Sequence, residues 1–298
     1  REDMETYQDV AEEVIRMYGY EHIEPTFLAS AQVTIGGENT VQKTEMRLKK
    51  ALCGVGAHEC IHYSFFSPSD LDMLKLPEDA PERHAIRIMN PISEELSLMR
   101  TTLAASMINA VVRNQKKGNL EGRLFEVAKK FIPKDLPLTE YPDERQTLCI
   151  AAFGVKEDFF TMKGMVEKVA EVLHVEFAYA NTKNTFLHPF QTASISCDGE
   201  EIGYFGKLAY DIADECDLRI PVYLCEIDLE CLSKYYGKKA MFKPLPKFAE
   251  EQRDLAIVVD KNITCGEIEA AMKEACKYIT SIKLFDIYEG AQIGEDKK

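Results

Sequence analysis

The residues with the clearest chemical potential are four carboxylates near the start of the chain, Asp3, Asp9, Glu12 and Glu13. If residues 5–19 form a helix, Asp9 lies three and four residues before Glu12 and Glu13, so these carboxylates share one face, and Asp3 can reach the same point. Like charges at this spacing repel unless a cation lies among them, and oxygen ligands of this kind suit Mg²⁺. Spacing alone favours a solvated acidic face near the positive helix N-terminus, so the magnesium interpretation needs further support.

Other residue types that often perform catalysis occur without a catalytic or metal-binding pattern. The six histidines show neither HxxxH nor HExxH spacing, and the nine cysteines are spread singly without a CxxC pair. We interpret the cysteines as the reduced thiols of a cytoplasmic protein, where they pack as small apolar residues. A P-loop, a nucleophile elbow and a dinucleotide fingerprint are also missing from the sequence.

The composition limits the class of protein. The 298 residues include 36 Lys and Arg against 50 Asp and Glu, which gives a net charge of −14. This charge argues against a surface that tracks nucleic-acid phosphates over its whole area, although it allows a local RNA contact. The sequence has no apolar run of about 18 residues, so we expect no membrane-spanning helix. Because it begins with Arg1, we expect a piece of a longer protein.

The elements that must position these residues are predicted from hydrophobic periodicity. Helices are predicted over residues 5–19, 38–53, 69–74, 102–118 and 160–173. Strands are predicted over residues 60–67, 84–90, 123–133, 146–155, 175–180, 190–208 and 220–229, with a hairpin turn at Asp198-Gly199. Because the strands outnumber the helices and follow one another in hairpin order, the sequence predicts an α+β fold with an antiparallel sheet.

The chain changes character at residues 237–253, which contain two prolines and several lysines and are interpreted as a linker. A strand over 254–260, a helix over 265–278 and a strand over 281–290 are predicted beyond it. A β-α-β segment of about 50 residues buries its sheet poorly by itself. We therefore expect that this last domain is truncated or that it uses surface from elsewhere.

Several stretches together resemble one family. NPISEELSLMRTTLAASMINAVVRNQKKG (90–118) and RLFEVAKKF (123–131) resemble the catalytic-like module of the bacterial phenylalanyl-tRNA synthetase β subunit. The opening RED-x5-D-x2-EEVIRMYGY resembles the end of the preceding helical domain, and KFAEEQRDLAIVVDKNITCGEIE with LFDIYEG resembles the start of a ferredoxin-like anticodon-binding domain. The resemblance implies a helical-domain end at residues 1–28, a class II aminoacyl-tRNA synthetase-like core at 29–240 and a truncated ferredoxin-like domain at 241–298.

The resemblance gives the acidic cluster a role. In this family four carboxylates at the opening spacing bind a magnesium ion that is shared with the α subunit, and the matching positions are Asp3, Asp9, Glu12 and Glu13. If the α subunit supplies part of the coordination, the chain by itself holds Mg²⁺ weakly.

The resemblance also implies an inactive core. A working class II core grips ATP with arginines, but Glu126 occupies the position on the second-motif strand after Gly122-Arg123-Leu124-Phe125, and IGYFGKLAYDI offers Lys207 and no arginine. A carboxylate repels triphosphate, so we assign no catalytic residues and expect the α subunit to bind ATP. The chain departs from the family pattern at Ala249, where the family has proline after phenylalanine, and at Ala209-Tyr210, where it has His-Pro.

The function implied by the resemblance is that of a non-catalytic β-subunit fragment of an α₂β₂ heterotetramer, whose α subunit charges tRNA(Phe) with ATP. Residues expected to contact RNA are Arg253, Lys283, Phe285 and Tyr288, although these aromatic side chains are as well explained by packing against the domain's own helix. A free-standing paralogue that acts as a binding or regulatory scaffold is the alternative. A metal-dependent hydrolase has less support, because the carboxylates lack a nearby histidine or lysine base.

Overall fold

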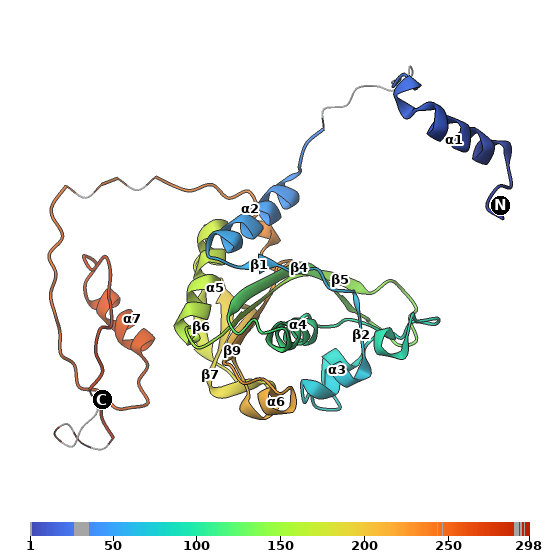
Figure 1. The fold of residues 1–298 in the computed structure, drawn as a ribbon. Coiled ribbons are helices and arrows are strands. Elements are labelled where there is room, and N and C mark those ends of the chain that lie inside the picture. Colours follow the sequence, from blue (N-terminus) through green and yellow to red (C-terminus); the bar gives the residue numbers. More distant parts are fainter. Residues whose placement is uncertain are drawn as a thin grey trace. The chain divides into compact units, whose positions relative to one another are not determined.

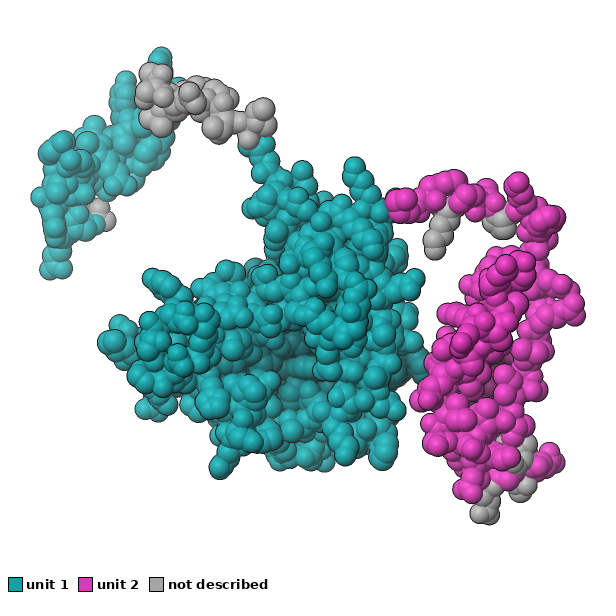
Figure 2. Space-filling model, turned by 180° about the vertical axis from the view of Figure 1, so that it is seen from behind, with its two compact units in different colours: residues 1–240 teal, residues 241–298 magenta. Residues whose placement is uncertain are grey.

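The computed structural model describes residues 2–26, 36–242, 244–245, 247–288, 292, 294 and 296–298. The chain divides into two compact units, residues 1–240 and residues 241–298, which Figure 2 shows in teal and magenta. The boundary predicted between residues 28 and 29 lies outside the described residues. Within the described ranges, no helix is long and apolar enough to cross a membrane.

A seven-stranded sheet forms the centre of the larger unit, in the order β1-β4-β5-β9-β8-β7-β6. Its strands are β1 (His58–Glu59), β4 (Gly122–Ile132), β5 (Asp143–Phe153), β6 (Ala178–Asn181), β7 (Leu187–Cys197), β8 (Glu200–Leu208) and β9 (Val222–Asp228). Every neighbouring pair is antiparallel except β1 with β4, which is parallel. The predicted α+β fold with a mostly antiparallel sheet and flanking helices is therefore confirmed.

Because successive side chains of a strand point to opposite faces, the sheet carries a separate apolar core on each face. On one face, which we call the α2/α5 face, α2 (Thr40–Gly54) and α5 (Phe159–Leu173) pack against Phe125 and Ile150. On the other, the α4 face, α3 (Pro68–Met73), α4 (Ala104–Lys116) and α6 (Tyr210–Glu215) share a core with Cys149 and Leu224. Figure 1 shows α4 lying in the curve of the sheet.

Local sequence explains how the strands turn and approach each other. Asp198 and Gly199 both have positive φ angles, 51° and 82°, as the two-residue turn between β7 and β8 requires. At Gly203 on β8, a Cβ atom would lie 2.1 Å from the carbonyl oxygen of Glu226 on β9. Glycine at this position therefore allows the two strands to pair closely.

The segment before α4 differs from the prediction. The strand predicted over 60–67 is reduced to β2 (Phe65–Phe66), which pairs with β3 (Leu98–Met99), and residues 84–90 contain only an isolated bridge from Arg87 to Leu98. The reason is that residues 60–64 are fixed by single contacts rather than by a ladder. The amide of Cys60 donates to the carbonyl of Phe125 at 2.7 Å, and the amide of Arg100 donates to the carbonyl of Ser64 at 2.9 Å.

Several short elements complete the chain. The helix predicted over 5–19 is confirmed as α1 (Tyr7–Tyr18), in which no residue is buried. The described 3₁₀ turns are η1 (Tyr20–His22), η2 (Pro81–Arg83), η3 (Glu94–Leu96) and η4 (Ser233–Tyr235).

The smaller unit matches its prediction only in the helix. α7 (Cys265–Ala275) lies where a helix was expected, capped at Thr264. The strands predicted over 254–260 and 281–290 are wrong for the described residues, which show only a bridge from Asp260 to Lys297, and residues 289–290 lie outside the described part. A strand is stabilised by a hydrogen-bonded neighbour and a covered apolar face. Here Leu255, Ile257 and Phe285 are exposed, so the apolar face is not covered. Among the described residues, pairing with a neighbour is confined to a few backbone hydrogen bonds between residues 259–261 and 296–298.

Candidate functional site

Helix α1 carries the predicted metal ligands, and Asp9 serves as part of its N-terminal cap. The Asp9 carboxylate accepts hydrogen bonds from the backbone amides of Thr6 at 2.7 Å and Glu5 at 3.0 Å, and from the Thr6 hydroxyl at 2.9 Å. The bond from the Thr6 backbone is the largest of the effects that lower the pKa of Asp9. Asp9 thus satisfies donors that the first turn of a helix leaves open.

The four carboxylates are not brought together into one group. Glu13 forms an ion pair with Arg16 at 2.5 Å, one turn along α1. Among the residues that the structure describes, no group of three or more His, Cys, Asp or Glu is placed to hold a metal ion. The donors have the oxygen chemistry that Mg²⁺ prefers, but this chain alone does not gather them. The magnesium site at Asp3, Asp9, Glu12 and Glu13 stays a prediction.

The α4 face of the sheet holds two buried carboxylates, of which Glu126 on β4 is the first. The Glu126 carboxylate lies 3.1 Å from the Arg100 guanidinium and 2.7 Å from Nδ1 of His62, and it accepts a hydrogen bond from the His62 amide at 3.1 Å. Arg100 is itself buried and also donates to the carbonyls of Lys129 at 2.8 Å and Tyr63 at 3.3 Å.

These contacts keep Glu126 ionised although it is buried. Burial is the largest influence and would raise the pKa of Glu126, but the hydrogen bond from His62 and the charge of Arg100 together outweigh it, so the pKa is lowered. The Glu126 carboxylate is therefore a charge that is neutralised by a buried arginine.

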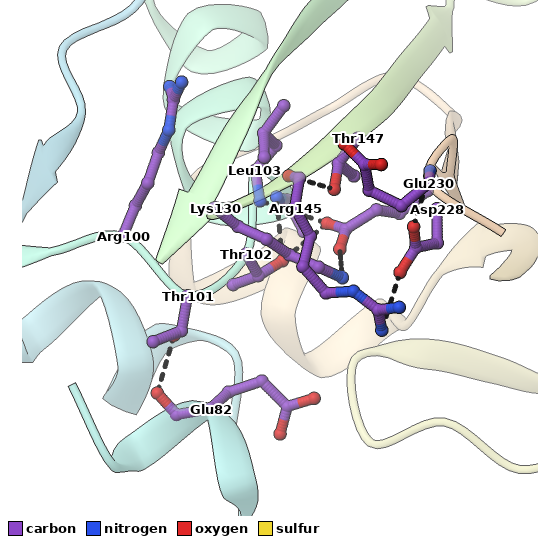
Figure 3. Close-up of polar contacts among 12 residues, drawn as sticks. Glu82, Arg100, Thr101, Thr102, Leu103, Lys130, Arg145, Thr147, Asp228 and Glu230 are labelled. Atoms are coloured by element: carbon purple, nitrogen blue, oxygen red, sulfur yellow. Dashed lines mark hydrogen bonds and ion pairs between the residues drawn. The ribbon is translucent and has the colours of Figure 1, made fainter. Parts of the chain in front are cut away.

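The second buried carboxylate is Glu226 on β9. One of its oxygens accepts hydrogen bonds from the Thr102 hydroxyl at 2.7 Å and from the Leu103 amide at 3.0 Å, at the start of α4. The other oxygen lies 3.4 Å from the ammonium of Lys130 on β4. Figure 3 shows Lys130, Thr102 and Leu103 close together, while Arg100 points away from them. Since a helix N-terminus attracts anions, Glu226 fills the anion position at the start of α4 with the chain's own charge.

The two basic residues named in the segments that resemble ATP-binding motifs, Arg123 and Lys207, contact other parts of the chain. Arg123 pairs in the sheet with Ala152 of the α2/α5 core and donates to Glu157 at 2.9 Å and to the carbonyl of Val55 at 2.8 Å. Lys207 pairs with Tyr223 of the same core, and its ammonium donates to the Tyr210 hydroxyl at 2.9 Å. Both therefore lie on the face of the sheet opposite Glu126 and Glu226.

A cavity of about 320 Å³ opens beside Glu226 on the α4 face. Its walls come from β4, β8 and β9, from the segment before α4 and from residues 183–186. Tyr204 contributes a phenol whose pKa burial raises well above its usual range, so it is neutral.

The four residues expected to contact RNA lie in the smaller unit. Phe285 and Tyr288 expose 71% and 55% of their surface, so they do not pack against α7 as core residues. Arg253 pairs with the nearby Glu251, and Lys283 is exposed. RNA contact by these residues stays a prediction.

The sequence did not predict the contacts around the two buried carboxylates. These contacts involve His62, Arg100, Thr102, Lys130 and Glu226. Arg100 and Thr102 fall inside the LMRTTLAAS stretch that suggested the family, and their polar side chains directly before an apolar helix were the available signal. Glu226 had a comparable signal, because it is a carboxylate that directly follows the apolar residues 222–225 of strand β9.

Comparison with known proteins points to one family. Residues 25–229 match the family described as phenylalanyl tRNA synthetase beta chain CLM domain, and residues 246–298 match the ferredoxin-fold anticodon binding domain. The phenylalanine–tRNA ligase β subunits of Clostridium tetani and Clostridium acetobutylicum are 36% and 35% identical, over 100% and 99% of this chain. A pyrrolysyl-tRNA synthetase structure from Desulfitobacterium hafniense aligns with a TM-score of 0.53 at 15% identity, covering 76% of this chain and 74% of that one.

The structural match identifies the larger unit as an aminoacyl-tRNA synthetase-like fold. At the level of sequence, the chain belongs to the family of phenylalanine–tRNA ligase β subunits, which confirms the resemblance. It spans 38% and 37% of the length of the two clostridial relatives.

Proposed function

We propose that this chain is a non-catalytic part of phenylalanine–tRNA ligase. It supports an α subunit that binds ATP and charges tRNA(Phe), within an α₂β₂ heterotetramer. The family membership supports the assignment to this ligase. The supporting role follows from the electrostatics of the α4 face.

The observation that carries the proposal is the pair of buried carboxylates on that face. Phosphoryl chemistry relies on cations that stabilise the charge of the phosphates. Here Arg100 is paired with Glu126, and Lys130 is paired with Glu226. A triphosphate brought to this face would have to compete with Glu126 and Glu226 for these two cations, and breaking a buried ion pair is costly. The face is thus suited to hold the sheet together rather than to hold ATP.

The magnesium ion of the complex is proposed to bind Asp3, Asp9, Glu12 and Glu13 together with groups from the α subunit. Groups from a second chain are needed because these four carboxylates are not gathered here. A bound Mg²⁺ would relieve the repulsion between like charges on α1 and join the two chains through their oxygen ligands.

The smaller unit is proposed to contact the anticodon region of tRNA. Phe285 and Tyr288 are exposed aromatic side chains, which stack on unpaired bases in many RNA-binding proteins, and Arg253 and Lys283 supply positive charge for the backbone. The match to an anticodon-binding domain supports this role.

The proposal is tested by ATP–pyrophosphate exchange and tRNA charging. We expect no exchange by the chain alone, copurification of its full-length parent with the α subunit, and charging by the recovered complex. Exchange by the chain alone would refute the non-catalytic role. A parent that does not copurify with α would favour the free-standing scaffold instead.

The metal role is tested separately with Glu12→Gln in the assembled enzyme. We expect charging to require a higher Mg²⁺ concentration, because the variant removes one ligand charge. Glu5→Gln is the matched control, since Glu5 is an exposed acidic residue outside the predicted ligand set. Identical magnesium titrations for both variants would mean that the carboxylates of α1 do not bind the metal and only form a solvated acidic face.

A further inference from the structure

Strand β7 leaves its regular pairing with β8 near its start. The ladder pairs Leu187 with Leu208 and Thr192 with Gly206, so residues 188–191 stand opposite a single residue of β8. On the outer side of the sheet, β6 pairs with β7 only after this segment. Bulges of this kind re-aim side chains and are common beside functional sites. Residues 188–191 therefore form an irregular segment that no strand covers on its outer side, and we call it the β7 bulge.

Internal contacts hold the β7 bulge in place. The Thr192 hydroxyl donates to the carbonyl of His188 at 2.6 Å, and the amide of Phe190 donates to Nδ1 of His188 at 3.2 Å. Gly206 allows the bulge to approach β8 closely, because a Cβ atom there would lie 2.5 Å from the carbonyl oxygen of Gln191. The side chain of Phe190 is thus presented by a fixed backbone.

The bulge carries part of an exposed cluster of aromatic and basic side chains. The centre of the His188 ring lies 6.1 Å from that of Phe190 and 5.3 Å from that of Tyr210. The Lys207 ammonium lies 4.6 Å from the centre of the Tyr210 ring and donates to the Tyr210 hydroxyl at 2.9 Å. Phe190 exposes 91% of its surface. The cluster therefore combines a free aromatic face with positive charge.

The nitrogen donors of this cluster are available to a ligand. Because Nδ1 of His188 accepts a backbone hydrogen bond, the proton of the neutral ring lies on Nε2. The Lys207 ammonium has further protons besides the one used for the Tyr210 hydroxyl. No carboxylate of the described residues forms an ion pair with Lys207, and Asp211, which follows Tyr210, pairs with Lys75 instead. The donors beside Phe190 therefore have no fixed anion.

We propose that the β7 bulge binds an unpaired segment of RNA. A base stacks on the free face of Phe190, and a phosphate of the same segment is bound by Lys207 and by Nε2 of His188. Aromatic rings with cations beside them hold single-stranded nucleic acid with little regard to its sequence. A protein partner fits less well, because the cluster mixes its rings with basic groups and lacks the continuous apolar area found at the centre of a protein interface.

This contact lies in the larger unit, so it goes beyond the RNA contact proposed for the smaller unit and can fail separately from it. The test uses the full chain with Phe285→Ala and Tyr288→Ala combined, which removes the aromatic side chains proposed to stack on RNA in the smaller unit. Fluorescence anisotropy with a labelled oligouridylate of about 12 nucleotides should show saturable binding, half-complete below about 100 μM at about 50 mM salt. No binding by this double variant would overturn the proposal. Equal binding by the double variant and the original chain would support the bulge and count against the smaller unit.

Substitutions at Phe190 test the stacking contact in the double variant. Phe190→Ala should weaken binding at least about fivefold, which is the lower limit for the loss of one stacked base. Phe190→Leu should weaken it similarly, because leucine keeps an apolar side chain but has no aromatic face, and Phe190→Trp should retain binding. Tyr141→Ala is the matched control, since Tyr141 is 92% exposed and lies in the connection between β4 and β5, at the other end of the sheet. Undiminished binding by Phe190→Ala or by Phe190→Leu would refute the stacking role.

The salt dependence of binding tests the phosphate contact. Lys207→Met should reduce the slope of the logarithm of affinity against the logarithm of salt concentration by about 0.7, the value for one phosphate contact on a single strand. Lys134→Met is the matched control, because Lys134 is exposed and pairs with Glu140 in the connection between β4 and β5. It should leave the slope unchanged. Equal slopes for the original and Lys207→Met would remove Lys207 from the site.

Photocrosslinking locates the site directly. The same oligomer with 4-thiouridine should crosslink to the peptide that contains residues 188–191, as identified by mass spectrometry, and Phe190→Ala should abolish this product. Crosslinks found only elsewhere on the chain would refute the assignment. If Phe190→Ala instead leaves RNA binding intact and abolishes copurification with the α subunit, the bulge is a protein-docking surface and the proposal is wrong.

Discussion

The carboxylates of the sheet and those of helix α1 differ in how the fold uses them. Glu126 and Glu226 are buried, and each is held by partners from distant parts of the chain, such as Arg100 and Thr102. Asp9 is only partly buried, and its carboxylate accepts hydrogen bonds from residues within four positions of itself. The first kind of carboxylate contributes to the stability of the whole unit, whereas the second contributes to one helix.

This difference explains why the two regions suit different roles. A buried carboxylate whose oxygens are occupied by the chain's own donors offers little to an added cation. An exposed carboxylate on a helix can exchange its local partner for a metal at small cost, since such surface contacts are weak. The predicted magnesium role therefore falls on α1, and the structural role falls on the sheet.

The largest expected effect is that of Glu126→Ala. Removing this carboxylate leaves the guanidinium of Arg100 buried without its charged partner, and breaking a buried ion pair in this way costs about 3–5 kcal/mol. We expect a loss of this size in the free energy of unfolding, measured with urea.

The contrast with an exposed pair provides the control for Glu126→Ala. Glu144→Ala removes a carboxylate from the neighbouring strand, whose partner Lys129 is half exposed. Exposed pairs contribute about 0–1 kcal/mol, so the urea midpoint should hardly move. Equal losses for both variants would show that burial of Glu126 does not set its importance.

A smaller loss is expected for Thr102→Val. The Thr102 hydroxyl donates to Glu226 at 2.7 Å and accepts from the Ala104 amide at 3.1 Å, so it joins β9 to the start of α4. Leaving buried hydrogen-bonding groups without a partner costs about 1–3 kcal/mol. We expect a loss in this range by urea unfolding. Thr161→Val is a useful comparison, since the Thr161 hydroxyl also takes part in a helix cap, by accepting from the Asp158 amide at 2.7 Å, but Thr161 is half-exposed. If Thr102→Val is as stable as the original protein, the hydrogen bonds of Thr102 between β9 and the start of α4 do not contribute to stability.

The two regions also differ in how far their structure followed from sequence. The long strands and α2, α4 and α5 were predicted because each has a clear apolar period and a covered face. The partners of Glu126 were not, because His62 and Arg100 are 64 and 26 residues away and meet it only through the folded sheet. The cap formed by Asp9 is encoded locally by Thr6 and its three-residue spacing. In the described residues of 254–260 and 281–288 the expected strands do not form, because an apolar run becomes a strand only when another strand lies beside it.

Acid should affect the sheet through Glu126. The pKa of this carboxyl is lowered in the folded chain, against the opposing effect of burial, by His62 and Arg100. A group with a lowered folded pKa contributes stability above its unfolded pKa and loses it as the pH falls through the folded value. Urea unfolding should therefore show stability falling below about pH 4.5, the ordinary value for this group. Glu126→Gln should show a shallower fall, and an unchanged acid profile would place the sensitivity in other carboxyls.

The smallest effect on overall stability is expected for Asp9→Ala, although it removes the same chemical group as Glu126→Ala. None of the residues of α1 is buried, so the loss of its cap should leave the urea midpoint of the sheet unchanged. The first turn of α1 should fray, because the amides of Thr6 and Glu5 lose their acceptor. Amide hydrogen exchange should therefore become several-fold faster in residues 7–12 and stay constant in β4 and β5. Glu12→Ala is the control, since it removes a carboxylate from the same helix without touching the cap. A shift in the urea midpoint for Asp9→Ala would mean that α1 contributes to the stability of the sheet. The carboxylates of α1 would then not differ from those of the sheet in the way proposed here.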